Sequence, residues 1–225
     1  MSNTRLLQNI AEVRAKYPGL NHRVKPIINS HVLQGEIKFH GNFNEIAISD
    51  SYLICIEIDF DYPLKIPRVF ETGNRIPPDF HKMSDGSLCL GVELEMIEYL
   101  AKDDNLLSFI QKFVISYLYS YSYFNKYGVM PYGERSHGSM GIIEFLMEKL
   151  SLSNQSELLP IITALSSDKF RYNGKKPCPC GSGIRMSDCS HKILLLHPPH
   201  YKYARMCKKF LEEMERNEQN EQHHC

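Results

Sequence analysis

Proline is the feature that most constrains how this chain can fold. Pro63, Pro67, Pro77 and Pro78 each lack a backbone N–H donor, and each ring holds φ at about −65°. A helix interior and a central strand both require that donor. We therefore predict that residues 72–95 form a structured loop that is pinned in place by its surroundings.

Alternating apolar and polar residues precede this loop and predict β-strands. One such run covers residues 33–39 and ends at Gly41, and a cleaner one covers residues 54–60. We expect another strand between them at residues 43–48, and a fourth at residues 68–71. The short connections favour an antiparallel meander.

Helical periodicity flanks the predicted sheet on both sides. Apolar residues share one helical face over residues 6–17, which predicts an N-terminal helix. The same spacing recurs over residues 106–121 and predicts a long amphipathic helix that ends near Gly128. Two further helices are expected at residues 140–150 and 158–165.

Composition excludes several classes of protein. Lys and Arg together number 26, as do Asp and Glu, so the net charge does not require nucleic acid or an anionic membrane as a partner. Residues 1–19 lack the apolar core of a signal peptide, and the most apolar long stretch, residues 109–124, is too polar to span a membrane. The seven cysteines form an odd set, which with no secretion signal indicates a reducing compartment. We expect a cytoplasmic protein.

Cys89 lies inside the predicted loop, ahead of the long helix. Thioester exchange needs a thiol that is accessible and fixed in position, and a proline-braced loop backed by a helix supports such a thiol. The alternative is a cysteine that packs as a small buried hydrophobic residue.

Two short motifs surround this position: Tyr62-Pro63-Leu64-Lys65-Ile66-Pro67 and Gly86-Ser87-Leu88-Cys89-Leu90. With the preceding meander and the following helix, they resemble the ubiquitin-conjugating enzymes, which show Tyr-Pro-x-x-Pro-Pro after the third strand and Gly-x-Ile-Cys-Leu around the active-site cysteine. The resemblance covers roughly residues 1–125. It implies the UBC fold, with Cys89 as the catalytic cysteine that carries an acyl group as a thioester.

His81 stands eight residues before Cys89, where the family has the asparagine of a His-Pro-Asn motif. In the family, that asparagine supports the loop and stabilises the oxyanion formed when a lysine attacks the thioester. A histidine can donate a hydrogen bond to the same oxygen or act as a base. A histidine that only braces the loop is the alternative interpretation.

Asp85 and Gly86 complete the pattern His81-x-x-x-Asp85-Gly86-x-x-Cys89-Leu90. This pattern looks like the bacterial branch of the family, found in antiphage (CBASS-type) operons beside cGAS-like nucleotidyltransferases. Asp85 is a candidate to orient His81 or the incoming amine. Asp-Gly is also a common turn pair, and a purely structural role is the alternative.

A second cluster follows a polar linker at residues 169–176. Cys178, Cys180, Cys189 and His191 supply four ligands within fourteen positions. Zn²⁺ favours a closed, tetrahedral Cys₃His arrangement of this kind in structural sites. We therefore predict a structural zinc ion.

The run Cys178-Pro179-Cys180-Gly181-Ser182-Gly183 resembles the zinc motif at the C-terminus of the SecA translocase, the SEC-C motif. In related proteins this motif docks protein partners and sometimes nucleic acid. The mild positive charge around it is consistent with either: Lys175, Lys176, Arg185 and Lys192. The alternatives are a redox or unliganded loop, or a different histidine as the fourth ligand, namely His197, His200, His223 or His224.

These elements predict an α+β protein: an antiparallel four-stranded meander flanked by helices in the UBC-like manner, then a small zinc knuckle and a C-terminal helix. We expect a UBC-like core at residues 1–128 and a helical extension at residues 129–168. A zinc module at residues 169–196 and a helix with a polar tail at residues 197–225 complete the chain.

Two classes of function are consistent with these features. As an enzyme, the protein forms a thioester at Cys89 with the C-terminus of a protein modifier and transfers it to an amine. The resemblance to the bacterial branch suggests a cGAS-like nucleotidyltransferase as that modifier, in antiphage defence. As a non-catalytic adaptor, a relative of the same fold binds a partner through its zinc knuckle. A cysteine hydrolase that uses Cys89 and His81 is a third possibility.

Overall fold

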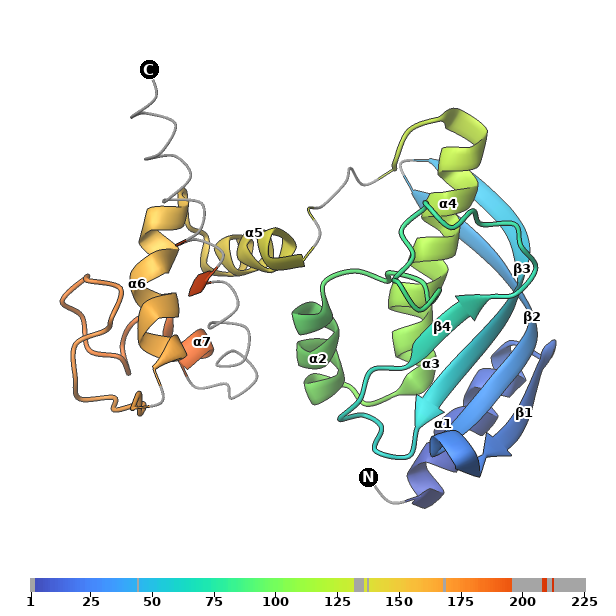
Figure 1. Ribbon diagram of the computed structural model, residues 1–225, viewed down its shortest axis with the longest axis horizontal. Helices are drawn as coiled ribbons and strands as arrows, with labels where there is room; N and C mark the ends of the chain where they lie inside the picture. The colour runs from blue at the N-terminus through green and yellow to red at the C-terminus, as the bar shows by residue number, and fades with distance from the viewer. Residues whose placement is uncertain are drawn as a thin grey trace. The chain divides into compact units, whose positions relative to one another are not determined.

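An antiparallel sheet of four strands forms the centre of the larger part of the chain (Figure 1). The strands are β1 (Leu20–Lys25), β2 (Ser30–Phe43), β3 (Ile46–Asp59) and β4 (Arg68–Glu71), paired in that order. The two long strands pair along their whole length, from Ser30 opposite Asp59 to Phe43 opposite Ile46. The computed structural model thus confirms the α+β class and the four-stranded antiparallel sheet.

One predicted strand was wrong, and one observed strand was not predicted. Residues 43–48 are not a separate strand, because Phe43 ends β2, Ile46 begins β3, and Glu45 lies in the turn between them with φ of 65°. The strand β1 was not predicted, since only Leu20 of its six residues is buried and its sequence shows no alternation.

The structure describes residues 3–43, 45–131, 136, 138–167, 169–195, 208, 209 and 212. They divide into a larger unit, which comprises residues 1–91 and 95–134, and a smaller unit, which comprises residues 92–94 and 135–225. The finer boundaries proposed from the sequence stay predictions. No helix in the described part of the chain is long and apolar enough to cross a membrane.

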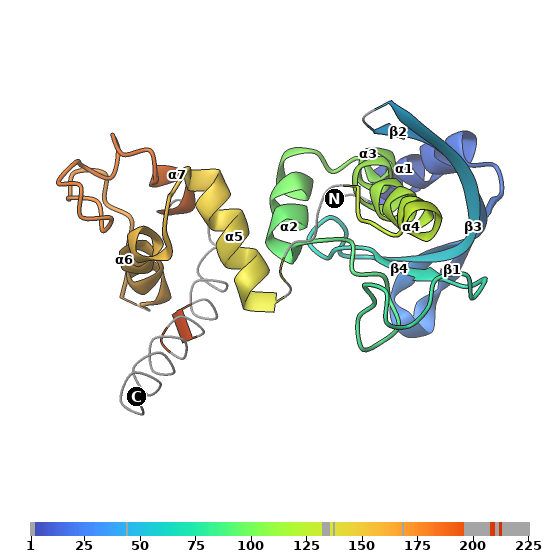
Figure 2. The ribbon, with the colours of Figure 1, turned by 90° about the horizontal axis from the view of Figure 1, so that it is seen from above.

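Helices of the larger unit pack on one side of the sheet (Figure 2). They are α1 (Asn3–Lys16), α2 (Glu93–Lys102, which belongs to this unit from residue 95 on), α3 (Leu106–Phe109), the π-helical segment η2 (Ile110–Ile115) and α4 (Ser116–Tyr127). A short 3₁₀ turn, η1 (Pro26–Ile28), follows β1. The run from α3 to α4 is continuous, and Gly128 ends it with φ of 73° and an N–H donated to Phe124 O. This confirms the predicted long helix, whereas α2 was not predicted.

The core lies between the inner face of the sheet and the long helical run, around which the sheet curves (Figure 2). Alternate residues of β3, Ile54, Ile56 and Ile58, are completely buried, as the alternation predicted. They belong to the same cluster as Leu6 and Ile10 of α1. Burial of each such side chain contributes about 1.5–3 kcal/mol to stability.

The smaller unit contains α5 (Gly138–Leu150), α6 (Gln155–Ser166) and α7 (Lys192–Leu195). The first two confirm the helices predicted at residues 140–150 and 158–165. The Asn154 side chain caps α6 by accepting the N–H of Glu157. The predicted C-terminal helix falls outside the described residues, apart from positions 208, 209 and 212.

The buried carboxylate of Glu71 shapes the start of the predicted loop. Its Oε1 atom accepts the N–H of Gly73 at 2.7 Å, and its Oε2 atom accepts those of Arg75 at 3.1 Å and Ile76 at 3.3 Å. Glu71 is only 8% exposed, so these bonds are shielded from water. The loop is confirmed as far as residue 92, where α2 follows.

Arg75 ties the same loop to the sheet and to α4. Its guanidinium donates to both carboxylate oxygens of Asp50, at 2.9 and 3.0 Å, and lies 4.2 Å from the ring centroid of Tyr52. Ser122 of α4 donates to Asp50 at 2.8 Å. Burial alone would raise the pKa of Asp50, but hydrogen bonds from Arg75 and Ser122 outweigh it and lower that pKa to about 2.

Substitution of Glu71 by Gln should destabilise the larger unit by about 2 kcal/mol, because an amide nitrogen cannot accept the loop N–H groups. We expect the midpoint of thermal unfolding to fall by about 5 °C. Glu36→Gln is the matched control, since the Glu36 side chain is 42% exposed and its partners are side chains, Lys38 at 3.3 Å and Ser51, and not loop N–H groups. Equal midpoints for Glu71→Gln and wild type would contradict the assigned role.

Asp50 should contribute a pH-dependent part of the stability. Its pKa is about 2 in the folded chain against an ordinary value of 3.8, so the unfolded chain binds the proton more readily. The contribution is therefore fully present above pH 3.8 and is lost as the pH falls through about 2. Urea unfolding between pH 5 and pH 2 should show a shallower dependence in Asp50→Asn than in wild type, and Asp79→Asn, which removes an exposed loop carboxyl, should retain the wild-type slope.

Candidate functional site

Residues 81–89 fold back on themselves as a short hairpin within the loop. Lys82 and Leu88 form an antiparallel bridge, and the Cys89 amide donates to His81 O at 2.8 Å. The turn closes at Asp85-Gly86, where Gly86 has φ of 82°. The hairpin brings the backbones of His81 and Cys89 directly opposite each other. Two residues that act in one catalytic site must lie close together in this way.

The hairpin is also joined to the sheet. The Leu88 amide donates to Val69 O of β4 at 2.7 Å, and the Leu88 side chain is buried in the core. Cys89 is partly exposed and free of any disulfide. Cys89 is therefore a partly exposed residue, next to a buried neighbour, on a backbone that is fixed to the sheet.

Side chains of α4 hold the loop from behind. The Tyr117 hydroxyl donates to the carbonyls of Phe80 at 3.0 Å and His81 at 3.3 Å, and the Tyr121 hydroxyl donates to Arg75 O at 2.6 Å. Burial, followed by the nearby Cys89 thiol, raises the pKa of Tyr117. Both tyrosines lie within the apolar face predicted for residues 106–121, a pattern that does not reveal their hydrogen bonds. The available sign was a hydroxyl at positions where phenylalanine would pack equally well.

Asp85 acts as a turn residue in this structure. Its Oδ1 atom accepts from the Ser87 amide at 3.0 Å and from the Ser87 hydroxyl at 2.6 Å, and its Oδ2 atom faces Arg68 Nη1 at 3.4 Å. Hydrogen bonds from Ser87, with Arg68 as a weaker influence, lower the pKa of Asp85. Both carboxylate oxygens have these partners, and the orientation of His81 by Asp85 stays a prediction.

His81 occupies an unusual backbone conformation with φ of 40°. Residues other than glycine adopt this left-handed region rarely. Its ring packs edge-on against Phe80, with ring centroids 5.0 Å apart. The structure therefore supports bracing of the loop, and a chemical role for the imidazole stays a prediction.

The remaining cysteines of the larger unit and the tail differ from Cys89. Cys55 on β3 is buried, and burial raises the pKa of its thiol. Cys207 and Cys225 fall outside the described residues. Within the described part of the larger unit, Cys89 is thus the cysteine that is not buried.

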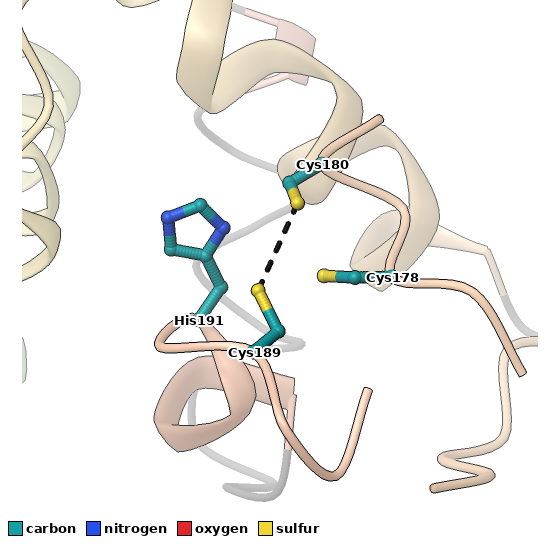
Figure 3. A group of neighbouring side chains, drawn as sticks. All are labelled: Cys178, Cys180, Cys189 and His191. Carbon is teal, nitrogen blue, oxygen red and sulfur yellow. Dashed lines mark hydrogen bonds between the residues drawn. The ribbon is translucent and has the colours of Figure 1, made fainter. Parts of the chain in front are cut away.

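The smaller unit brings all four predicted ligands together (Figure 3). The sulfur atoms of Cys178, Cys180 and Cys189 and a ring nitrogen of His191 all lie within 4.8 Å of one another. In Figure 3 the four side chains converge on one space, and the sulfurs of Cys180 and Cys189 are 3.8 Å apart. This arrangement is compatible with a metal site.

Backbone geometry explains why this short segment folds around the cluster. Gly181 and Gly183 both have positive φ, at 82° and 75°, which lets the chain turn twice between the second and third cysteines. The Cys178 amide donates to Ile184 O at 2.7 Å across that turn. The turn directs Cys178 and Cys180 toward Cys189.

The donor atoms are arranged in a way that is compatible with a metal ion. His191 Nδ1 is buried and makes no hydrogen bond of full geometry among the described residues, although the ring lies close enough to Cys180 to help lower the pKa of that thiol. A tetrahedral ion with bonds of about 2.3 Å to sulfur holds two sulfurs about 3.8 Å apart. The Cys180 and Cys189 sulfurs show this separation.

The thiols of the cluster differ in how readily they ionise. Burial raises the pKa of Cys178 to about 12. Burial acts in the same direction on Cys180, but hydrogen bonds from Ser182 and from neighbouring ligands outweigh it and lower the pKa of Cys180 to about 6. A bound cation favours loss of the remaining thiol protons. The residues present therefore fit a metal.

Four other histidines were alternatives to His191 as the fourth ligand, and all of them fall outside the described residues: His197, His200, His223 and His224.

The chain matches no protein-family model, no curated protein and no solved structure. The resemblances to the ubiquitin-conjugating enzymes and to the SEC-C motif therefore stay predictions, and the two candidate sites are defined by the geometry of the Cys89 hairpin and of the Cys₃His cluster.

Proposed function

We propose that this protein is an acyl transferase of the ubiquitin-conjugating type, with Cys89 as the residue that carries the acyl group. The observation that carries the proposal is the partly exposed residue Cys89 on a hairpin that is closed by the bond from the Cys89 amide to His81 O and joined to β4 through the Leu88 amide. A nucleophile fixed in this way loses little freedom when it reacts, which favours the reaction.

The first step exchanges one thioester for another. Cys89 Sγ attacks the carbonyl carbon of a thioester carried by a separate activating protein. A new bond forms between that carbon and Sγ, the bond to the donor sulfur breaks, and the donor leaves as a thiol with the proton that Cys89 gives up.

The second step transfers the acyl group to an amine. The amine nitrogen attacks the thioester carbon, an amide bond forms, and Cys89 leaves as a thiolate. His81 is the candidate to take the proton from the amine or to donate a hydrogen bond to the oxyanion. In the bacterial branch that the loop motif resembles, the modifier is the C-terminus of a cGAS-like nucleotidyltransferase, and we propose the same class of substrate in antiphage defence.

Incubation with a candidate modifier and its activating protein should give a thiol-sensitive adduct on a non-reducing gel. Cys89→Ala should abolish the adduct, and Cys89→Ser should replace it with a thiol-resistant ester. Cys55→Ala is the control, because Cys55 is buried, and should retain the adduct. An adduct that persists unchanged in Cys89→Ala would disprove Cys89 as the residue that carries the acyl group. If wild-type protein forms no adduct and Cys89→Ser retains cellular function, the result would favour a non-catalytic adaptor.

We further propose that the cluster of Cys178, Cys180, Cys189 and His191 holds a structural zinc ion. Three sulfurs and one imidazole nitrogen are the ligands that Zn²⁺ prefers in closed sites, and four protein ligands leave no position for substrate. Zinc would supply the attraction that holds the two cysteine-bearing turns together. The described segment around it has few buried apolar residues, among them Met186, so the metal would supply much of its stability.

Elemental analysis of purified wild-type protein should give about one equivalent of zinc per chain. Cys178→Ser should lose most of the metal, because Cys178 is the buried first ligand of the turn. Cys55→Ser, a matched cysteine substitution in the sheet, should retain it. Full zinc content in Cys178→Ser would contradict the ligand set.

A further inference from the structure

Two tyrosines of α4 occupy closely matched positions behind the loop. Tyr117 and Tyr121 lie about one helical turn apart, each is 8% exposed, and each ring packs edge-on against Phe80. Their hydroxyls differ in what they bind, since Tyr121 donates to Arg75 O, whereas Tyr117 donates to the carbonyls of Phe80 and His81. The two residues thus share an environment and differ in the carbonyl groups that their hydroxyls bind.

The His81 carbonyl receives two donors at once. The Tyr117 hydroxyl lies 3.3 Å from it, and the Cys89 amide nitrogen lies 2.8 Å from it. Through this shared oxygen, one side chain of α4 is linked to the backbone of the reactive cysteine by two consecutive hydrogen bonds.

The conformation of His81 makes this link consequential. Its φ of 40° is energetically costly for a residue with a side chain, and such a conformation persists only where its surroundings favour it. Tyr117 and Cys89 both bind the carbonyl that this conformation presents. Because burial and the Cys89 thiol raise the pKa of Tyr117, its hydroxyl keeps its proton and remains a donor.

We infer that Tyr117 is a positioning residue for Cys89. Its hydroxyl fixes the His81 carbonyl, that carbonyl fixes the Cys89 amide, and the position of the Cys89 side chain is restricted as a result. A role of this restraint in acyl transfer rests on the proposed function. The restraint itself, the pair of hydrogen bonds that link Tyr117 to the Cys89 backbone, does not.

Tyr117→Phe and Tyr121→Phe provide the test, because each removes one hydroxyl and keeps the ring. Peptide-resolved alkylation with iodoacetamide at one fixed pH should modify Cys89 about fivefold faster in Tyr117→Phe, since one net hydrogen bond is lost and the hairpin opens more often. The rate for Cys89 should stay at the wild-type value in Tyr121→Phe. Alkylation of Cys55, buried in the sheet of the same unit, should be unchanged in both variants.

Single-turnover acyl transfer gives an independent readout. In Tyr117→Phe the rate constant at saturating donor should fall about fivefold, while the donor concentration for half-saturation stays unchanged, because positioning affects the reaction and not binding. If wild-type protein transfers no acyl group, the proposed function fails and the alkylation experiment still decides the positioning.

Three results would overturn the inference. One is a wild-type alkylation rate for Cys89 in Tyr117→Phe. Another is an equal acceleration in Tyr121→Phe, which would show that either hydroxyl merely stabilises the loop. The last is a parallel acceleration at Cys55, which would show general opening of the unit.

Discussion

The backbone N–H and C=O groups of the loop after Glu71 need hydrogen-bond partners although most of them lie outside regular secondary structure. Side chains supply several of these partners, above all at the start of the loop. Glu71 accepts three N–H groups, while Lys82 and Tyr121 donate to the carbonyls of Ile76 and Arg75. Because these donors and acceptors are themselves fixed in β4, α4 and the loop, a proline-rich segment acquires one conformation, and the hairpin of Cys89 is built on it.

The segment around the Cys₃His cluster also needs hydrogen-bond partners for its backbone, and it has fewer residues to supply them. Its backbone closes through a few cross-turn bonds, such as Met186 N to Lys176 O at 2.9 Å. Among its described residues, few side chains are buried: Cys178, Cys189, Met186 and Leu195. A bound metal ion, as proposed above, would satisfy His191 Nδ1, a buried atom for which the described residues supply no hydrogen bond of full geometry.

The sequence predicted those features that depend on local chemistry. The alternation at Ile54, Ile56 and Ile58, the helix stop at Gly128 and the spacing of the metal ligands each reflect contacts between residues that are near in the chain or repeat regularly. The strand β1 escaped prediction because it pairs at an edge and buries only Leu20. The loop partners also escaped prediction, since Tyr117 and His81 are 36 positions apart and no local pattern relates a hydroxyl to a distant carbonyl.

The hydrogen bonds to the loop and the sheet explain why α4 carries polar residues at buried positions. A buried hydroxyl is costly unless it is hydrogen-bonded, so a helix that only filled the core would carry leucine or phenylalanine in place of Tyr117, Tyr121 and Ser122. Each of these hydroxyls has a partner outside its own helix, at Phe80 and His81, at Arg75, and at Asp50 respectively. The hydroxyl groups that distinguish α4 from a purely apolar core helix therefore also hold the loop. They fix the Cys89 hairpin and the start of the loop in position relative to the sheet.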